Sequence, residues 1–361
     1  MNSLDFSQEA VERASDYHRP LYLATAASVA LSAATYAVLA WPARGAFDAV
    51  SGFGWAGAAA AWAGIVVVAS TLVHLPLGYW RGLARERRWG FSTQTLRGWL
   101  VDQAKGAAVS IVLAAAAWTG VVALARALPG WWVAPAAAAA ALAVLFLAFV
   151  APVVLEPLFN RFRPLEDLEL AARLRTIAED ATVPVREVLV TDLSRRTTKV
   201  NAYVSGLGAT RRVVLGDTLL AAADPGQIAV IVAHELGHRR ERHVAKLTLV
   251  AMLGAAAAAV VVWAALGTAV ASPRELPVVL LILLGLELAM LAPGAALSRR
   301  WERVADRISI ELTHDLPAYE RAHIELAQRN LSDIAPPRLA YVLLFSHPTP
   351  MERLAYGRNL V

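Results

Sequence analysis

The chain alternates between long apolar segments and shorter polar ones, and this alternation predicts most of its architecture. Six predominantly apolar segments, each longer than 20 residues, lie at 21–42, 55–79, 107–128, 131–155, 247–271 and 276–297. About 20 apolar residues in a helix are enough to cross a hydrocarbon core of about 30 Å. The segments are rich in Ala and Leu and lack the period-2 alternation of a membrane β-barrel. We therefore predict six membrane-spanning helices.

The polar segment 156–246 has the pattern of a compact α/β unit. Helical spacing of apolar residues predicts a helix over 166–182, and β-branched runs predict strands at 187–191, 199–205 and 211–216. Asp224 and Pro225 then form a typical helix start. We expect that helix to continue without a break into the fifth span. The predicted parts are a four-span region (1–155), the α/β segment (156–246), a two-span hairpin (247–297) and a C-terminal helical segment (298–361).

The composition agrees with a membrane protein and excludes several other classes. Of the 361 residues, 57% are hydrophobic and 17% are charged, whereas soluble domains carry about 25% charged residues. The absence of Cys excludes disulfides, thiolate metal sites and cysteine proteases. The ratio of 31 Arg to 3 Lys, with heavy use of Ala, suggests a bacterial source.

The positive charges predict how the chain is oriented. Of the 34 Lys and Arg residues, 31 lie on the side of the spans that carries both termini and both large polar segments. The positive-inside rule therefore predicts a multi-pass protein of the cell membrane with these parts in the cytosol. Topology accounts for the basic charge, so we expect no nucleic-acid partner.

The strongest chemical signal is the motif His234-Glu235-Leu236-Gly237-His238. Two His residues four positions apart lie on one face of a helix, so both imidazoles can reach one Zn²⁺. Glu235 can then act as the general base toward a water molecule at the metal. Two solvated His on a helix surface are the alternative, and the motif favours zinc.

A catalytic zinc site needs a third protein ligand and one open position. The metzincin pattern would require Gly at 241 and His at 244, but Glu241 and Val244 stand there. Glu302 is a better candidate. The expected turn near 272–273 lies 34 residues from His238 and 30 from Glu302. The two arms of a helical hairpin would therefore differ by only about 6 Å in length, which brings both residues to the same depth.

Three further residues carry weaker expectations. Asp306 lies one helical turn beyond Glu302, where its carboxylate can accept the free N–H of a ligating His. His243 is expected to point away from the ligand face, as a supporting or an unrelated residue. Glu287 lies midway along the sixth span, where we expect it either to line a cavity or to form a hydrogen bond between helices.

These motifs occur in an order that resembles a known family. It comprises the integral-membrane zinc metallopeptidases typified by type I CAAX prenyl endopeptidase (metallopeptidase family 48), of which bacterial HtpX is a more distant member. The stretches that carry the resemblance are His234-Glu235-Leu236-Gly237-His238, Ser298-Arg299-Arg300-Trp301-Glu302 with Ala305-Asp306, Asn201-Ala202-Tyr203, Arg212-Val213-Val214-Leu215, and Ser346-His347-Pro348-Thr349-Pro350 with Glu352-Arg353-Leu354.

The resemblance implies a mainly α-helical, polytopic membrane protein with about six spans around a chamber and a small cytosolic α/β domain of the gluzincin type. The eukaryotic members have seven spans, so the first one is expected to be missing here. Beyond the fold, the resemblance implies one zinc ion per chain, with His234, His238 and Glu302 as ligands and Glu235 as the base.

Further residues receive roles from the same resemblance. It implies that His347 and Arg353 line the cleft and help to stabilise the oxyanion. It also implies that Asn201-Ala202-Tyr203 aligns the substrate as an added β-strand.

The substrate is less narrowly defined than the chemistry. We expect a peptide or membrane-protein substrate, possibly lipid-modified, together with contacts to membrane lipids. One alternative is an HtpX-like protease for quality control of membrane proteins. A remote alternative is a zinc-binding transporter or scaffold without protease activity, for which inverted repeats or broken helices at the membrane midplane would be typical. The sequence has no such repeats.

Overall fold

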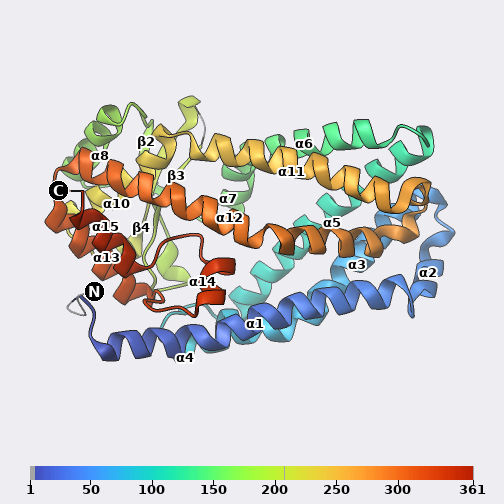
Figure 1. The fold of residues 1–361 in the computed structure, drawn as a ribbon, viewed down its shortest axis with the longest axis horizontal. Helices are drawn as coiled ribbons and strands as arrows, with labels where there is room; N and C mark the ends of the chain where they lie inside the picture. The colour runs from blue at the N-terminus through green and yellow to red at the C-terminus, as the bar shows by residue number, and fades with distance from the viewer. Residues whose placement is uncertain (1–4, 207, 361) are drawn as a thin grey trace.

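The computed structural model describes residues 5–206 and 208–360, and in this part of the chain six helices are long and apolar enough to cross a membrane (Figure 1). These candidate spans are Gln8–Ala40, Gly54–Arg88, Leu96–Ala127, Val133–Phe159, His243–Ala271 and Pro273–Thr313. The prediction of six spans is therefore confirmed. Several helices run well beyond their apolar segments because they continue into polar sequence near the sheet.

The spans are built from long helices that lie side by side along the long axis of the molecule (Figure 1). The main ones are α1 (Gln8–Ala40), α3 (Gly54–Tyr79), α5 (Leu96–Ala127), α6 (Val133–Val150), α11 (His243–Leu266) and α12 (Leu276–Thr313). π-helical turns extend α3 into α4 (Arg85–Arg88) and α6 into α7 (Glu156–Phe159). Helix α11 packs on α6, α3 packs on α5, and α1 packs on both α12 and α3.

An apolar cluster joins the helices at the end of the bundle far from the sheet, which we call the distal end. The cluster includes Phe47, Trp62, Trp118, Val122, Trp132, Val262 and Val270. Two of its indoles also donate hydrogen bonds across the bundle, from Trp118 to the carbonyl of Pro273 at 2.9 Å and from Trp132 to that of Gly267 at 3.1 Å. Short helical segments, among them α2 (Asp48–Ser51), form the connections here.

A four-stranded sheet lies at the opposite end, which we call the sheet end. Its strands are β1 (Phe162–Pro164), β2 (Glu187–Thr191), β3 (Ala202–Ser205) and β4 (Arg212–Gly216), in the order β1-β2-β4-β3. Strands β2 and β4 are parallel, and the other two pairs are antiparallel. The three predicted strands are confirmed, whereas β1 is too short to leave a periodic signal. Helices α8 (Leu168–Asp180) and α10 (Pro225–Arg240) share a core with the sheet.

The start of α10 follows the sequence prediction, but its end does not. Asp224 caps the helix in a capping box with Gln227, and Pro225 is its first residue. The helix ends at Arg240, and Arg242 adopts a left-handed conformation (φ 56°) before α11 begins at His243. The prediction that this helix continues without a break into the fifth span was therefore wrong. The break is needed because α10 packs against α12 and β3, while α11 packs against α6.

The chain after the last span returns to the sheet end. There α13 (Leu316–Asn330), α14 (Arg338–Leu344) and α15 (Pro350–Arg358) follow α12, and α13 and α15 pack on each other. Both termini lie at this same end (Figure 1). The molecule is thus a mainly α-helical, polytopic membrane protein with a small α/β unit at one end, as the sequence predicts. Helix α12 runs straight through the expected boundary at residue 297, and the division into four parts stays a prediction.

Candidate metal centre and active site

The site forms where α10 crosses α12, and the crossing is unusually close. A β-carbon at Gly237 would lie 3.2 Å from Cα of Ala305 and 3.3 Å from Cβ of Ile308. A larger residue at 237 would push the two helices apart by a few tenths of an ångström, so glycine, facing a small residue on α12, suits this close approach. The glycine inside the His-Glu motif therefore has a packing role, because it brings the two histidines of α10 within reach of α12.

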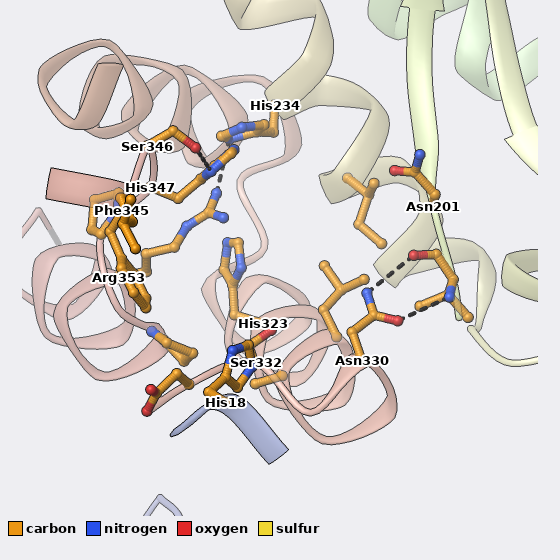
Figure 2. A pocket seen from close by; sticks show the side chains of 18 of the residues that line it. His18, Asn201, His234, His323, Asn330, Ser332, Phe345, Ser346, His347 and Arg353 are labelled. Carbon is orange, nitrogen blue, oxygen red and sulfur yellow. Dashed lines mark hydrogen bonds between the residues drawn. The ribbon is translucent and has the colours of Figure 1, made fainter. Parts of the chain in front are cut away.

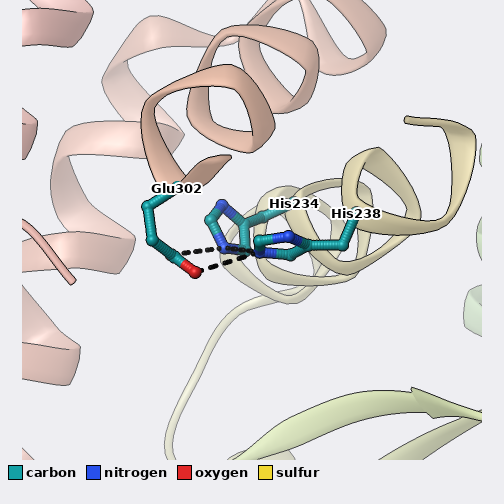
Figure 3. A group of neighbouring side chains, drawn as sticks. All are labelled: His234, His238 and Glu302. Atoms are coloured by element: carbon teal, nitrogen blue, oxygen red, sulfur yellow. Dashed lines mark hydrogen bonds and ion pairs between the residues drawn. The ribbon is translucent and has the colours of Figure 1, made fainter. Parts of the chain in front are cut away.

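Three side chains converge at this crossing, His234 and His238 from α10 and Glu302 from α12 (Figure 3). The Nε2 atoms of the two histidines are 3.1 Å apart. The Glu302 oxygens lie 3.2 Å from them, Oε2 from His234 and Oε1 from His238. A tetrahedral zinc site with bonds of about 2.0–2.1 Å has ligand atoms about 3.3 Å apart. The donor set and its spacing therefore fit zinc.

The environment of Glu302 supports the same interpretation. Its side chain is buried, and among the described residues its Oε2 atom has no hydrogen-bond partner despite lying near His234. A buried carboxylate without such a partner is costly, and a cation would compensate for it. The residues present thus fit a divalent metal on both geometry and charge.

Asp306 and Arg353 lie at the Nδ1 side of His234, opposite the Nε2 atom that faces the other ligand candidates. The Nδ1 atom of His234 lies 2.9 Å from Oδ1 of Asp306, which is fully buried. Arg353 of α15 donates from Nε to Asp306 Oδ2 at 2.9 Å and from Nη2 to Oδ1. A carboxylate that accepts the Nδ1 proton leaves Nε2 free and directed at the metal. The end of the chain is thereby fastened to the metal centre.

These contacts shift the protonation of His234. Burial and the positive charge of Arg353 oppose its protonation, but the nearby carboxylates of Asp306 and Glu302 outweigh them and raise the pKa of His234 to about 9 when no metal competes. Burial likewise opposes the charge on Arg353, yet the adjacent Asp306 carboxylate raises the pKa of this guanidinium above its usual value. A metal that binds here near neutral pH must displace a proton from His234.

A cavity of about 730 Å³ is bordered by His234, one of the three ligand candidates (Figure 2). Its wall includes Glu235, Asn201, Ala202, His347 and Arg353, together with residues of α1 and α13. The Nε2 atom of His347 is 3.4 Å from Glu302 Oε1, and the side chain is 59% exposed. The structure therefore brings these sequence candidates together around one space.

Tyr203 is the exception among the sequence candidates. It lines a second cavity of about 400 Å³, whose wall also contains Arg239 and residues of α6 and α11. Successive side chains of a strand point to opposite faces, so neighbours on β3 face different spaces. The predicted three-residue substrate segment thus borders two cavities rather than one.

Two histidines near the centre were not among the predicted site residues, although the sequence left His243 open as a supporting or an unrelated residue. His243 contacts the ligand candidate His238, with 3.0 Å between their Nδ1 atoms, and its ring stacks on Trp301. His323 of α13 is buried, borders the cavity and lies 3.8 Å from Asp306. Burial lowers the pKa of His323 well below its usual value, as does Arg353. Its place on the buried face of an amphipathic helix was the one signal available.

Glu287 of α12 also has a defined environment. It is exposed on the surface of the described chain, and no hydrogen bond or ion pair joins it to another described residue. The expected alternative of a hydrogen bond between helices is therefore not realised.

The family of the protein follows from comparison with known sequences. The chain belongs to peptidase family M48, whose model matches residues 164–360. The model of the CAAX prenyl protease N-terminal region, described as five membrane helices, matches residues 4–161. Four of the six candidate spans lie within that second range.

Individual relatives support this assignment along most of the chain. A protein of Bacillus subtilis (strain 168), named uncharacterized metalloprotease YhfN, is 32% identical over 82% of this chain and 72% of its own length. CAAX prenyl protease 1 of Saccharomyces cerevisiae is 30% identical over 53% of this chain and 42% of its own length. The crystal structure of S. mikatae Ste24p shares the fold, with a TM-score of 0.81 over 98% of this chain and 89% of that chain at 23% identity.

Fold, site and family together define the class of the protein. It is a multi-pass membrane metalloendopeptidase of the zinc-dependent family M48, similar to CAAX prenyl protease 1. Its substrates are peptides, and its spans contact lipid. The expectation of a zinc metallopeptidase is confirmed, and the family assignment lends no support to a transporter or scaffold.

Proposed function

We propose that His234, His238 and Glu302 bind one zinc ion per chain and that the protein hydrolyses peptide bonds in the adjoining cavity. The observation that carries this proposal is the convergence of three side chains, with 3.1–3.2 Å between the nearest donor atoms of each pair, next to the cavity that Glu235 lines. One edge of the site is left open toward this cavity, as a catalytic centre requires.

The residues around the metal then have separate roles. When bound, zinc polarises the scissile carbonyl and lowers the pKa of water at the site. Glu235 takes the proton of the attacking water and delivers it to the leaving amine. Asp306 orients His234, and Arg353 keeps the Asp306 carboxylate charged and in place. His347, at 3.4 Å from Glu302, donates toward the negative charge that develops on the carbonyl oxygen.

Strand β3 is proposed to bind the substrate. It is the last strand in the sheet order, so one of its edges has no strand partner. Asn201 and Ala202 border the same cavity as Glu235. A peptide paired with this edge would lie extended in the cavity beside the general base. Tyr203 then contacts the part of the peptide that passes toward the second cavity.

The proposed substrates are segments of membrane proteins, with lipid-modified C-terminal peptides as the first candidates. The metal centre lies at the sheet end, where both termini are found, and the excess of Lys and Arg on this side supports a cytosolic location. Similarity to CAAX prenyl protease 1 supports a lipid-modified peptide. Degradation of damaged membrane proteins is the competing substrate class.

The test compares Glu235→Gln with the wild type as purified full-length proteins in detergent. We expect the variant to keep stoichiometric zinc and to lose cleavage of casein and of a prenylated peptide. Glu241→Gln, a change of a nearby acid that does not border the cavity, is the control and should leave both properties unchanged. Full activity of Glu235→Gln would remove the general base from the proposal. A preference for the prenylated peptide over its unmodified form supports lipid-modified substrates, and equal rates support the broader class.

A further inference from the structure

Only a few backbone N–H and C=O groups on the free edge of β3 are available to pair with an added peptide strand. In the antiparallel pair with β4, Asn201 accepts a hydrogen bond from Gly216 N–H at 2.9 Å. Bonded and non-bonded pairs alternate along such a ladder, so residues 200, 202 and 204 direct their N–H and C=O groups to the opposite side. An added peptide strand can pair only with these three residues.

Asn330, the last residue of α13, already occupies the first of these positions. Its Oδ1 accepts a hydrogen bond from the N–H of Val200 at 3.0 Å, and its Nδ2 donates to the C=O of Val200 at 3.1 Å (Figure 2). One amide side chain thus makes both bonds that one residue of a neighbouring strand would make. Asn330 also borders the cavity, so it stands in the path of a peptide lying along β3.

Arg239 limits the edge at the other end. Its Nη2 donates a hydrogen bond to the C=O of Val204. No side chain of the described residues bonds to the N–H or C=O of Ala202, which lies between the two occupied positions. The pairing edge is therefore reduced to Ala202 and the N–H of Val204.

The position of Asn330 is fixed by contacts from the first span. His18 of α1 lies with Nε2 at 2.7 Å from the C=O of Leu331, the C-cap residue that directly follows α13. Tyr22 donates to Asp333 at 2.5 Å, two residues further along. Because α1 holds this turn, the backbone at the end of α13 is fixed next to β3, within reach of the Asn330 side chain.

We propose that Asn330 is a specificity-determining residue that sets how many substrate residues pair with β3. The inference rests on the proposed function, in which a peptide is aligned on this edge. Asn330 ends the strand pairing at Ala202 on one side, and residues of the substrate beyond that point make no backbone bonds with the protein. Removal of Asn330 would free Val200 and lengthen the paired stretch by two residues, the spacing between edge-facing positions.

The experiment uses full-length protein in detergent and one unmodified casein-derived peptide that it cleaves at a single bond. Two series of this peptide are lengthened residue by residue, one at each end, and kcat/KM is measured for every member. In the wild type, kcat/KM should rise with length and reach a plateau in both series. In Asn330→Ala, the plateau of one series should move outward by two residues, with a gain of about three- to tenfold, while the other series stays unchanged.

Two further variants serve as a conservative substitution and as a control. Asn330→Asp has the same size and still accepts from Val200 N–H, so it frees the C=O alone and should give the same displacement with a smaller gain. Arg329→Ala removes an exposed neighbour paired with Glu325 and should leave both plateaus in place. If Asn330→Ala does not fold, the Asp variant decides the question.

The possible outcomes separate the two proposals. An unchanged plateau in a folded, zinc-loaded Asn330 variant would overturn the role of Asn330 and leave the protease proposal standing. Equal displacement in both series would also overturn it, because that result indicates general loosening. Absence of cleavage by the wild type, or cleavage by Glu235→Gln, would overturn the proposed function itself.

Discussion

The two ends of the helix bundle are closed by different kinds of contact. At the sheet end, α10 and α12 meet through buried charged and polar groups, including His234, Glu302 and Asp306. At the distal end, the cluster around Trp62 and Trp118 consists of hydrophobic residues only, and none of the buried polar side chains among the described residues belongs to it. Helix α12 therefore reaches a polar centre at one end and a mainly apolar closure at the other, where the ion pairs Arg44–Glu275 and Arg274–Asp48 join the connecting segments.

The difference separates function from stability along the length of the molecule. The buried charges at the sheet end are expensive to desolvate and are tolerated only when paired or bound to a metal. Apolar contacts at the distal end require neither paired charges nor a bound metal. Substitutions at the sheet end should therefore change metal binding and catalysis, and substitutions at the distal end should change the stability of the fold.

The largest effect on the centre is expected from Glu302→Gln. The amide cannot supply the negative charge of the third ligand, so zinc affinity should fall by more than the roughly 10–100-fold typical of residues that only support ligands. Cleavage of casein should fall to background. Zinc content measured by atomic emission, with the exposed Glu311→Gln on the same helix as control, checks this prediction. Normal zinc content would exclude Glu302 as a ligand.

Asp306→Asn should have the next largest effect. It removes the charge that holds His234 and leaves Arg353 buried beside a neutral amide, so zinc affinity should fall by about 10–100-fold. Titration with a competing chelator measures this loss. If affinity is unchanged while activity falls, Asp306 acts on the substrate instead of on the ligand.

The pH dependence of zinc binding should be steep. Asp306 and Glu302 raise the pKa of His234 to about 9, against the opposing effect of burial, so below that pH zinc must displace a proton. Apparent affinity should therefore increase by about tenfold per pH unit as the pH rises from about 7 and should level off above about 9. Chelator competition at several pH values tests this, and a flat profile would show that His234 is already neutral.

The smallest effect on the centre is expected from Trp62→Ala at the distal end. This indole is fully buried and packs edge-to-face on Phe47, so its loss should lower the free energy of unfolding by about 3 kcal/mol or more. Zinc affinity should remain within about threefold of the wild type. Thermal unfolding in detergent and the chelator titration measure the two quantities, and a large loss of zinc would show that the two ends are coupled.

The sequence was sufficient to predict features that depend on a continuous stretch of chain. The six spans follow from hydrophobic length, and β2 and β4 begin and end close to the predicted limits. The proximity of Glu302 to the histidines could be anticipated because helix rise converts residue number into depth. The break at Arg242 could not be anticipated, because the sequence there contains no Gly or Pro. It lets α10 pack mainly on α12 and α11 pack mainly on α6.

Residues that border the cavity because of tertiary packing also could not be predicted from the sequence. His323 and Asn330 belong to α13, and no motif indicates where that helix docks. Their positions depend on contacts between α1 and the end of α13, through His18 and Tyr22. Nearly the whole length of the chain separates these partners, and no local pattern encodes such a pairing.

The ion pair between Arg353 and Asp306 has a consequence for the biosynthesis of the protein. Arg353 is translated after every span, and it secures a group on α12 that orients a histidine on α10. A ribosome-bound chain that still lacks α15 cannot complete this arrangement, even with all its membrane helices inserted. Proteolytic competence is therefore delayed until α15 has been translated after all six spans, which protects the nascent chain and the insertion machinery from premature cutting.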